Sequence, residues 1–134
     1  TANTVGILSL LAGAQFLKRR GIEEIYDHEL SLCAQLYGDL SGKEGIRLYC
    51  PPIRHGDRAP VLSFNIEGMT SMEAAELLDG EGFAVRAGLH CAPLAHRTAG
   101  TERTGTVRFS FAHDSTAEQT ERAAEILCET VKNL

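Results

Sequence analysis

The chain has 134 residues, of which 43% are hydrophobic and 23% charged, and its net charge is −5. That length allows one domain with a real core and is too short for two comfortable ones. The negative charge argues against a nucleic acid or an anionic membrane surface as partner, and no apolar run approaches the ~20 residues that span a bilayer.

Helical spacing governs the first forty residues. Val5, Leu8, Ala12 and Phe16 recur at helical intervals, and basic residues close that helix before Gly21 breaks it. A second helix carries an apolar stripe at steps of four and three, formed by Tyr26, Leu30, Cys33, Tyr37 and Leu40. Because the sequence has no initiator methionine, we expect it to begin partway through a larger protein.

The hydrophobic period then changes from helical to alternating. A strand is predicted at Ile46, Leu48 and Cys50, and two prolines stop it. The polar segment Arg54 to Arg58 predicts a loop that leads to a second strand. That strand places on one face Leu62, Phe64 and Ile66.

Strand and helix signals continue through the middle of the chain. Thr70 and Glu73 form a capping box for a short helix through Leu77 and Leu78. Phe83 to Val85 predicts a short third strand.

The last third predicts a loop, a strand and a helix. A Gly- and Thr-rich loop is expected over Thr98 to Thr106. The strand after it has on one face Val107, Phe109 and Phe111. Ser115 and Glu118 predict a second capping box. The inner stripe of the final helix is expected to be Thr120, Ala124, Leu127, Val131 and Leu134.

The order of elements indicates the fold class. Two helices are followed by β-β-α-β-β-α, which predicts an α+β domain with a mostly antiparallel sheet covered by helices. The four cysteines are scattered, without a C-x-x-C pair or a secretory signal, so we expect reduced thiols and a cytoplasmic protein.

The segment Arg86-Ala-Gly-Leu-His-Cys-Ala-Pro-Leu94 is the main candidate for chemistry. It places Cys91 in a loop beside His90 and near Arg86, and cationic neighbours favour the reactive thiolate. A buried, inert cysteine is the alternative. The other three cysteines lie on apolar stripes or strand positions and are expected to be structural.

The two histidines near Cys91 raise the question of a metal site. A structural zinc site needs four ligands at short paired spacings, and His90 and His96 do not supply them. No metal site is therefore predicted. His90 is better explained as a proton-transfer or orienting group, or as a solvated loop residue.

Two arginines and the three lysines are the remaining residues considered for a site. Arg108 and Arg86 each suit a bidentate grip on a carboxylate, although an arginine on an exposed sheet face is also ordinary. The chain lacks G-x-x-x-x-G-K and G-x-G-x-x-G motifs. None of the three lysines, Lys18, Lys43 and Lys132, is expected to serve as an amine nucleophile.

These residues carry a resemblance to a known family. Arg86-Ala-Gly-x-His-Cys-Ala and Thr106-Val-Arg-Phe-Ser110, with the Ser/Thr-capped helix that follows, resemble the C-terminal part of class V aminotransferase-fold enzymes. The cysteine desulfurase and selenocysteine lyase branch is the most similar. Thr1-Ala-Asn3 and the strand Leu62-Ser-Phe-Asn-Ile66 also match, so the resemblance covers nearly all of the chain.

The resemblance implies a pyridoxal phosphate enzyme whose Schiff-base lysine lies in a large domain outside this chain. Residues 1–20 would then end the large-domain region or connect to it, and residues 21–134 would form the small C-terminal domain. Cys91 would take sulfur from cofactor-bound cysteine and hold it as a persulfide. A homodimer and a sulfur-acceptor protein are implied partners.

The same resemblance assigns the remaining site residues. Arg108 would bind the substrate carboxylate and Arg86 would line the same pocket. Thr1 would help to hold the cofactor phosphate of the partner subunit. His90 precedes the nucleophile and is placed with Cys91 among the catalytic residues.

Two departures from the family pattern leave the substrate open between cysteine, selenocysteine and another amino acid. Cys91-Ala-Pro-Leu94 is one residue shorter than the desulfurase pattern, and Ala2 stands in place of proline. Two alternatives remain: another class V transamination or lyase reaction in which Cys91 is incidental, and a stand-alone binding module.

Overall fold

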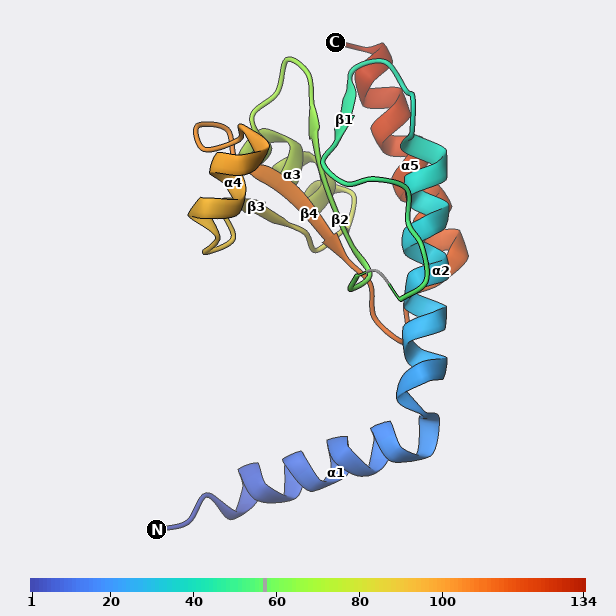
Figure 1. Ribbon diagram of the computed structural model, residues 1–134, viewed down its shortest axis with the longest axis vertical. Helices are drawn as coiled ribbons and strands as arrows, with labels where there is room; N and C mark the ends of the chain where they lie inside the picture. The colour runs from blue at the N-terminus through green and yellow to red at the C-terminus, as the bar shows by residue number, and fades with distance from the viewer. Residues whose placement is uncertain (57) are drawn as a thin grey trace.

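The computed structural model describes residues 1–56 and 58–134. Within these residues the chain forms five helices and four strands (Figure 1). In chain order they are α1 (Thr4–Arg20), α2 (Ile22–Leu40), β1 (Ile46–Leu48), β2 (Val61–Ile66), α3 (Ser71–Gly80), β3 (Arg86–Gly88), α4 (Pro93–Ala99), β4 (Thr106–Ser110) and α5 (Ala117–Lys132).

The four strands form one antiparallel sheet in the order β1-β2-β4-β3. The α+β class expected from the sequence is confirmed. Because strand side chains alternate between faces, the register puts Leu62 and Phe109 on one face and the neighbouring pair Ser63 and Arg108 on the other.

The hydrophobic core lies between one face of the sheet and the helices α2, α3 and α5. Its fully buried members include Leu36 of α2, Phe64 of β2 and Leu127 of α5. Phe64 and Phe109 stack with ring centroids 5.7 Å apart. The apolar side of the sheet is therefore covered by helices, and the polar side is left for α4 and the loops.

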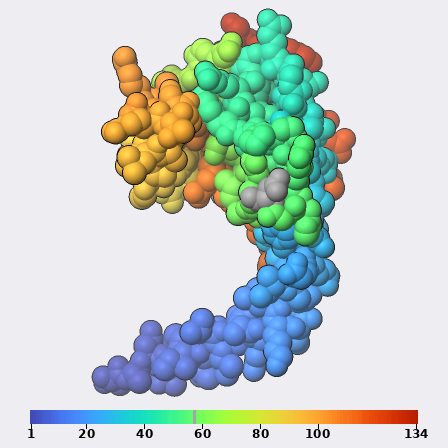
Figure 2. Space-filling view, in the orientation of Figure 1, coloured from blue at the N-terminus to red at the C-terminus, as the bar shows by residue number. Residues whose placement is uncertain are grey.

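The first helix stands clear of this core. Gly21, whose φ of 89° suits glycine, separates α1 from α2, and α1 projects as an arm from the body (Figures 1 and 2). None of its residues is buried, and Leu10 is 75% exposed. No helix in the described part of the chain is long and apolar enough to cross a membrane.

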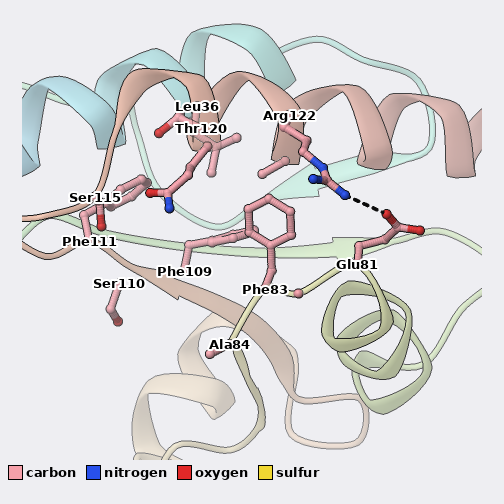
Figure 3. Close-up of a pocket in the computed structure, with 13 residues that line it drawn as sticks. Leu36, Glu81, Phe83, Ala84, Phe109, Ser110, Phe111, Ser115, Thr120 and Arg122 are labelled. Atoms are coloured by element: carbon pink, nitrogen blue, oxygen red, sulfur yellow. Dashed lines mark hydrogen bonds and ion pairs between the residues drawn. The ribbon is translucent and has the colours of Figure 1, made fainter.

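The third strand lies three residues later than predicted. Phe83 to Val85 do not pair, and β3 begins at Arg86. Ahead of β3 the chain diverges from β4 and leaves a hollow of about 330 Å³ against α5. Figure 3 shows Phe83 pointing towards α5 beside Phe109. The apolar side chain of Phe83 therefore packs against the core although the residue is not part of a strand.

Two further predictions in the second half were wrong. Part of the loop expected over Thr98 to Thr106 belongs to α4, which has Pro93 at its start and ends at Gly100 in the left-handed conformation. The final helix is capped by Thr116 and Gln119, one residue later than Ser115 and Glu118.

The last residue also lies elsewhere than predicted. Because α5 stops at Lys132, Leu134 lies beyond the helix and is 68% exposed instead of on the inner stripe. The capping box of Thr70 and Glu73 is present as predicted, and the described residues of the segment Arg54 to Arg58, which exclude Asp57, form a loop. Two strands are shorter than predicted, because β1 ends at Leu48 before Cys50 and β4 ends at Ser110 before Phe111.

Candidate active site

Cys91 lies in a tight turn between β3 and α4. The Leu89 carbonyl accepts a hydrogen bond from the Ala92 amide at 2.9 Å, and both central residues have positive φ, 50° for His90 and 58° for Cys91. This is the pattern of a type I′ turn, which normally takes Asn or Gly. A side chain in the left-handed region costs about 1–2 kcal/mol. The turn therefore holds an exposed thiol at the expense of backbone strain.

His90 points from this turn back towards β4. Its Nε2 lies 3.0 Å from the Thr106 carbonyl oxygen and 3.2 Å from Thr106 Oγ1. A carbonyl oxygen can only accept, so Nε2 carries the proton and donates it. Nδ1 is then an unprotonated acceptor, and it is buried with no hydrogen-bond partner within residues 1–56 and 58–134.

The charge of His90 is controlled by its surroundings. Burial of the ring lowers the pKa of His90 below its ordinary value of 6.5, and the charges of Arg108, His96 and Arg86 lower it further. The hydrogen bond to the Thr106 carbonyl acts in the opposite direction. The net effect favours the neutral imidazole, in which Nδ1 is unprotonated.

Arg86 and Arg108 lie directly opposite each other on β3 and β4. Like charges at paired positions destabilise a sheet unless something compensates them. Neither forms an ion pair with an acidic side chain in the described part of the chain, and Arg108 Nε is buried without a hydrogen-bond partner. The pair is therefore suited to an anionic ligand, such as a carboxylate.

A groove of about 360 Å³ runs between α4 and the polar face of the sheet. Arg108 and Ser63 line it from the sheet, and His90 and His96 line it from the turn and α4. Cys91 sits between two lining residues, His90 and Ala92, with its own side chain exposed. His90 and Arg108 thus line one groove, whereas Cys91 and Arg86 do not line it and lie next to it, Cys91 adjacent to His90 in the chain and Arg86 paired with Arg108.

Thr1 does not join this cluster. It is exposed at the free end of the α1 arm, which projects away from α4 in Figure 1. None of the three lysines lines the groove. The described residues also contain no group of three His, Cys, Asp or Glu side chains placed to hold a metal ion.

The structure adds residues that the sequence analysis did not single out for the site. Asn65 Nδ2 donates to Tyr49 Oη at 3.2 Å and to the Gly105 carbonyl at 3.0 Å, while its Oδ1 is buried without a partner. Ser63 and Asn65 could have been found, because both are polar positions that alternate with the apolar face of β2. Tyr49 had a comparable signal, because it alternates with Leu48 and Cys50 in the first predicted strand.

The hollow in Figure 3 differs in chemistry from the groove. It is lined by aromatic rings, among them Phe83 and Phe111, and an ion pair of 3.3 Å between Arg122 and Glu81 lies beside it. No cysteine or histidine lines it. The candidate residues His90 and Arg108 line the groove on the polar side of the sheet and do not line this hollow.

Cys91→Gly is expected to raise the free energy of unfolding by about 1 kcal/mol, because glycine adopts positive φ without the steric cost. The exposed cysteine side chain contributes little packing that could be lost. Urea titration of the purified chain measures the effect. Ala92→Gly is the matched control: Ala92 has a φ of −126°, so glycine there should only lower stability. Equal losses in both variants would contradict a strained turn.

Known proteins resemble this chain in sequence and in fold. Residues 1–123 match the family model described as aminotransferase class-V. A probable cysteine desulfurase from Xylella fastidiosa is 37% identical over 134 residues, which cover 100% of this chain and 31% of the relative. One from Synechocystis is 32% identical over 125 residues, covering 93% of this chain and 29% of the relative.

Solved structures show the same fold. The apo structure of cysteine desulfurase from Thermococcus onnurineus matches with a TM-score of 0.90 and 32% identity, covering 100% of this chain and 32% of that one. The cysteine desulfurase CsdA from Escherichia coli matches with a TM-score of 0.85 and 27% identity, covering 100% and 32%. The chain thus spans about a third of the length of the proteins it matches. It belongs to the class V aminotransferase family.

Proposed function

We propose that this chain is the small C-terminal domain of a pyridoxal phosphate-dependent cysteine desulfurase. Residues 21–134 form the domain, and residues 1–20 connect it to the large domain. The observation that carries the proposal is the exposed thiol of Cys91, held in a strained turn beside His90 at the edge of a groove that contains Arg108. Strain of this kind persists where function requires the geometry.

The groove fits a cofactor that is joined to an amino acid. Its free polar atoms are of both kinds: Arg108 Nε is a donor for a carboxylate, and His90 Nδ1 is an acceptor for a proton. Pyridoxal phosphate, when bound, withdraws electrons from the attached amino acid and weakens its bonds. Since no lysine lines the groove, the lysine that holds the cofactor would come from the large domain.

Arg108 is proposed to bind the substrate carboxylate with the two parallel N–H donors of its guanidinium group. Its position on the central strand β4 fixes where that carboxylate lies. Arg86, paired opposite on β3, adds positive charge to the same place. An anionic substrate would then relieve the repulsion between the two arginines.

Cys91 is proposed to act as the nucleophile. Its thiolate attacks the sulfur atom of the bound cysteine, so that an S–S bond forms while the C–S bond breaks. The electron pair of the C–S bond stays with the carbon, which takes up a proton to become alanine, and Cys91 is left as a persulfide. His90 Nδ1 is unprotonated and has no partner in the described residues, Cys91 Sγ included, so it is proposed to accept the thiol proton once the Cys91 side chain turns towards it.

The same proposal names the partners and the substrate of the full-length enzyme. The persulfide would pass to a sulfur-acceptor protein, and Thr1, exposed at the end of α1, would reach the cofactor phosphate of the other subunit in a cytoplasmic homodimer. L-cysteine is the proposed substrate. The curated relatives from Xylella fastidiosa and Synechocystis, named as probable cysteine desulfurases, support this choice.

The full-length enzyme with bound cofactor should release one alanine for each sulfur atom removed from L-cysteine. In the absence of an acceptor, mass spectrometry should find one added sulfur atom on the peptide that contains Cys91. Transfer of the amino group to a keto acid without sulfur release would instead identify a transaminase. Absence of both reactions would leave a binding module and refute the proposal.

A further inference from the structure

A second histidine lies behind His90 in the groove. His96 is on α4 and is only 6% exposed, and its ring centroid lies 5.7 Å from that of His90. Its Nδ1 is 2.7 Å from the hydroxyl oxygen of Thr101, which is itself buried. The ring of His96 is therefore fixed by a hydrogen bond on the side away from Nε2.

This hydrogen bond is not needed to end the helix. At the C-terminal end of α4, the Gly100 amide donates to the Arg97 carbonyl and the Thr101 amide donates to the His96 carbonyl at 2.8 Å. The backbone thus satisfies the terminal carbonyls by itself. A buried imidazole at this position, with its side chain tied to Thr101, calls for another explanation.

The ring of His90 has a fixed neighbour on each of two elements. Thr106 of β4 binds its Nε2, and the ring of His96 lies beside it on α4 at an angle of 40°. Its Nδ1 is left buried and unpaired within the described residues. A ring flip would place that nitrogen against the Thr106 carbonyl and move the acceptor away from the groove.

We propose that His96 is a positioning residue that holds the His90 ring with Nδ1 available as the proton acceptor. The inference rests on the proposed function, in which His90 takes the thiol proton of Cys91. Thr101 fixes His96, His96 packs beside His90, and Thr106 sets the tautomer. The assembly joins α4 to β4 across the groove.

Charge reinforces this geometry. The charged groups that face His90 are Arg86 on β3, Arg108 on β4 and His96 on α4, and all three act against a proton on His90. No carboxylate is among the groups that affect it. Loss of the His96 imidazole should therefore raise the pKa of His90 and leave it protonated, and unable to accept, at a higher pH.

NMR of the 15N-labelled chain tests the inference, because two-bond 1H–15N couplings report imidazole tautomers and their titration. With five histidines in the chain, assignment by single substitution is practical. His90 should show a single Nε2–H tautomer. His96→Phe keeps an aromatic ring but removes the basic imidazole, and it should raise the His90 titration midpoint. The exposed His113→Phe is the matched control and should change neither reading.

Thr101→Val provides a second variant of nearly equal volume in case His96→Phe disturbs folding. It removes the hydrogen bond to His96 and should produce a mixture of His90 tautomers. An unchanged tautomer and midpoint in both variants would overturn the inference. These readings do not depend on sulfur transfer, so they distinguish failure of this inference from failure of the proposed function.

Discussion

Cys91→Ser in the full-length enzyme is expected to lower alanine release from L-cysteine by at least about 10³-fold and to abolish the persulfide. Loss of a covalent nucleophile has effects of this order or larger. A serine hydroxyl is almost fully protonated at neutral pH, and it cannot hold sulfur as a persulfide. Because Cys91 is exposed, the substitution should leave the fold intact. Alanine release measures the first effect, and mass spectrometry of the peptide that contains residue 91 measures the second.

Cys128→Ser is the matched control for this experiment. Cys128 lies on α5 and is only partly buried, away from the groove, so its replacement should leave alanine release near the wild-type rate. If the Cys91 variant releases alanine at the wild-type rate and still forms a persulfide elsewhere, Cys91 is not the nucleophile. The reaction would then belong to another cysteine of the enzyme.

Arg108→Lys in the full-length enzyme is expected to reduce kcat/KM for L-cysteine by about 100-fold. The lysine keeps the positive charge but loses the planar pair of donors that binds a carboxylate at two points. The loss of a buried, charge-assisted contact corresponds to about 2–3 kcal/mol. Most of the effect should be on KM, because the carboxylate is bound before any bond breaks. Steady-state kinetics measure both parameters.

Arg47→Lys controls for charge on the same face of the sheet. Arg47 lies on β1, is exposed and stacks over the ring of Tyr49 at 5.2 Å. Its replacement should change kcat/KM little. Equal effects of the two substitutions would indicate that only the general positive charge of this face matters, and would contradict a specific carboxylate contact by Arg108.

Much of the fold could be predicted from the sequence because the signals were local. Alternation at Leu62, Phe64 and Ile66 is a property of β2 alone, and the capping box of Thr70 fixes the start of α3 within four residues. The start of β3 is not determined by a local signal. It depends on where β4 runs, since Arg86 pairs with Arg108 and the residues before it do not reach a partner.

The short helix α4 was missed for a different reason. The residues with which it lines the groove include Ala95 and Ala99, which give little hydrophobic contrast, and it has only seven residues. Periodicity is a weak signal over less than two turns. The groove could not be predicted for the same reason, because it exists only when α4 folds back over the polar face of the sheet.

The residues of the candidate site could be proposed from the sequence, but their arrangement in space could not. Residue types and spacing singled out Cys91 and His90, and the family resemblance assigned Arg86 and Arg108. Their convergence depends on the pairing of β3 with β4 and on the turn at Cys91. The orientation of His90 towards Thr106, and with it the free Nδ1, follows from contacts between segments sixteen residues apart.

The three-residue strand β3 lies at the edge of the sheet and pairs only with β4. Edge strands with few partners open more readily than central ones. Local opening of β3 would carry away Arg86 and the turn with Cys91 together, while Arg108 stayed anchored on its central strand. Reversible fraying of β3 would therefore separate Cys91 from Arg108 well before the whole domain unfolds. A large domain docked over this edge would hold β3 in place and keep the two residues together.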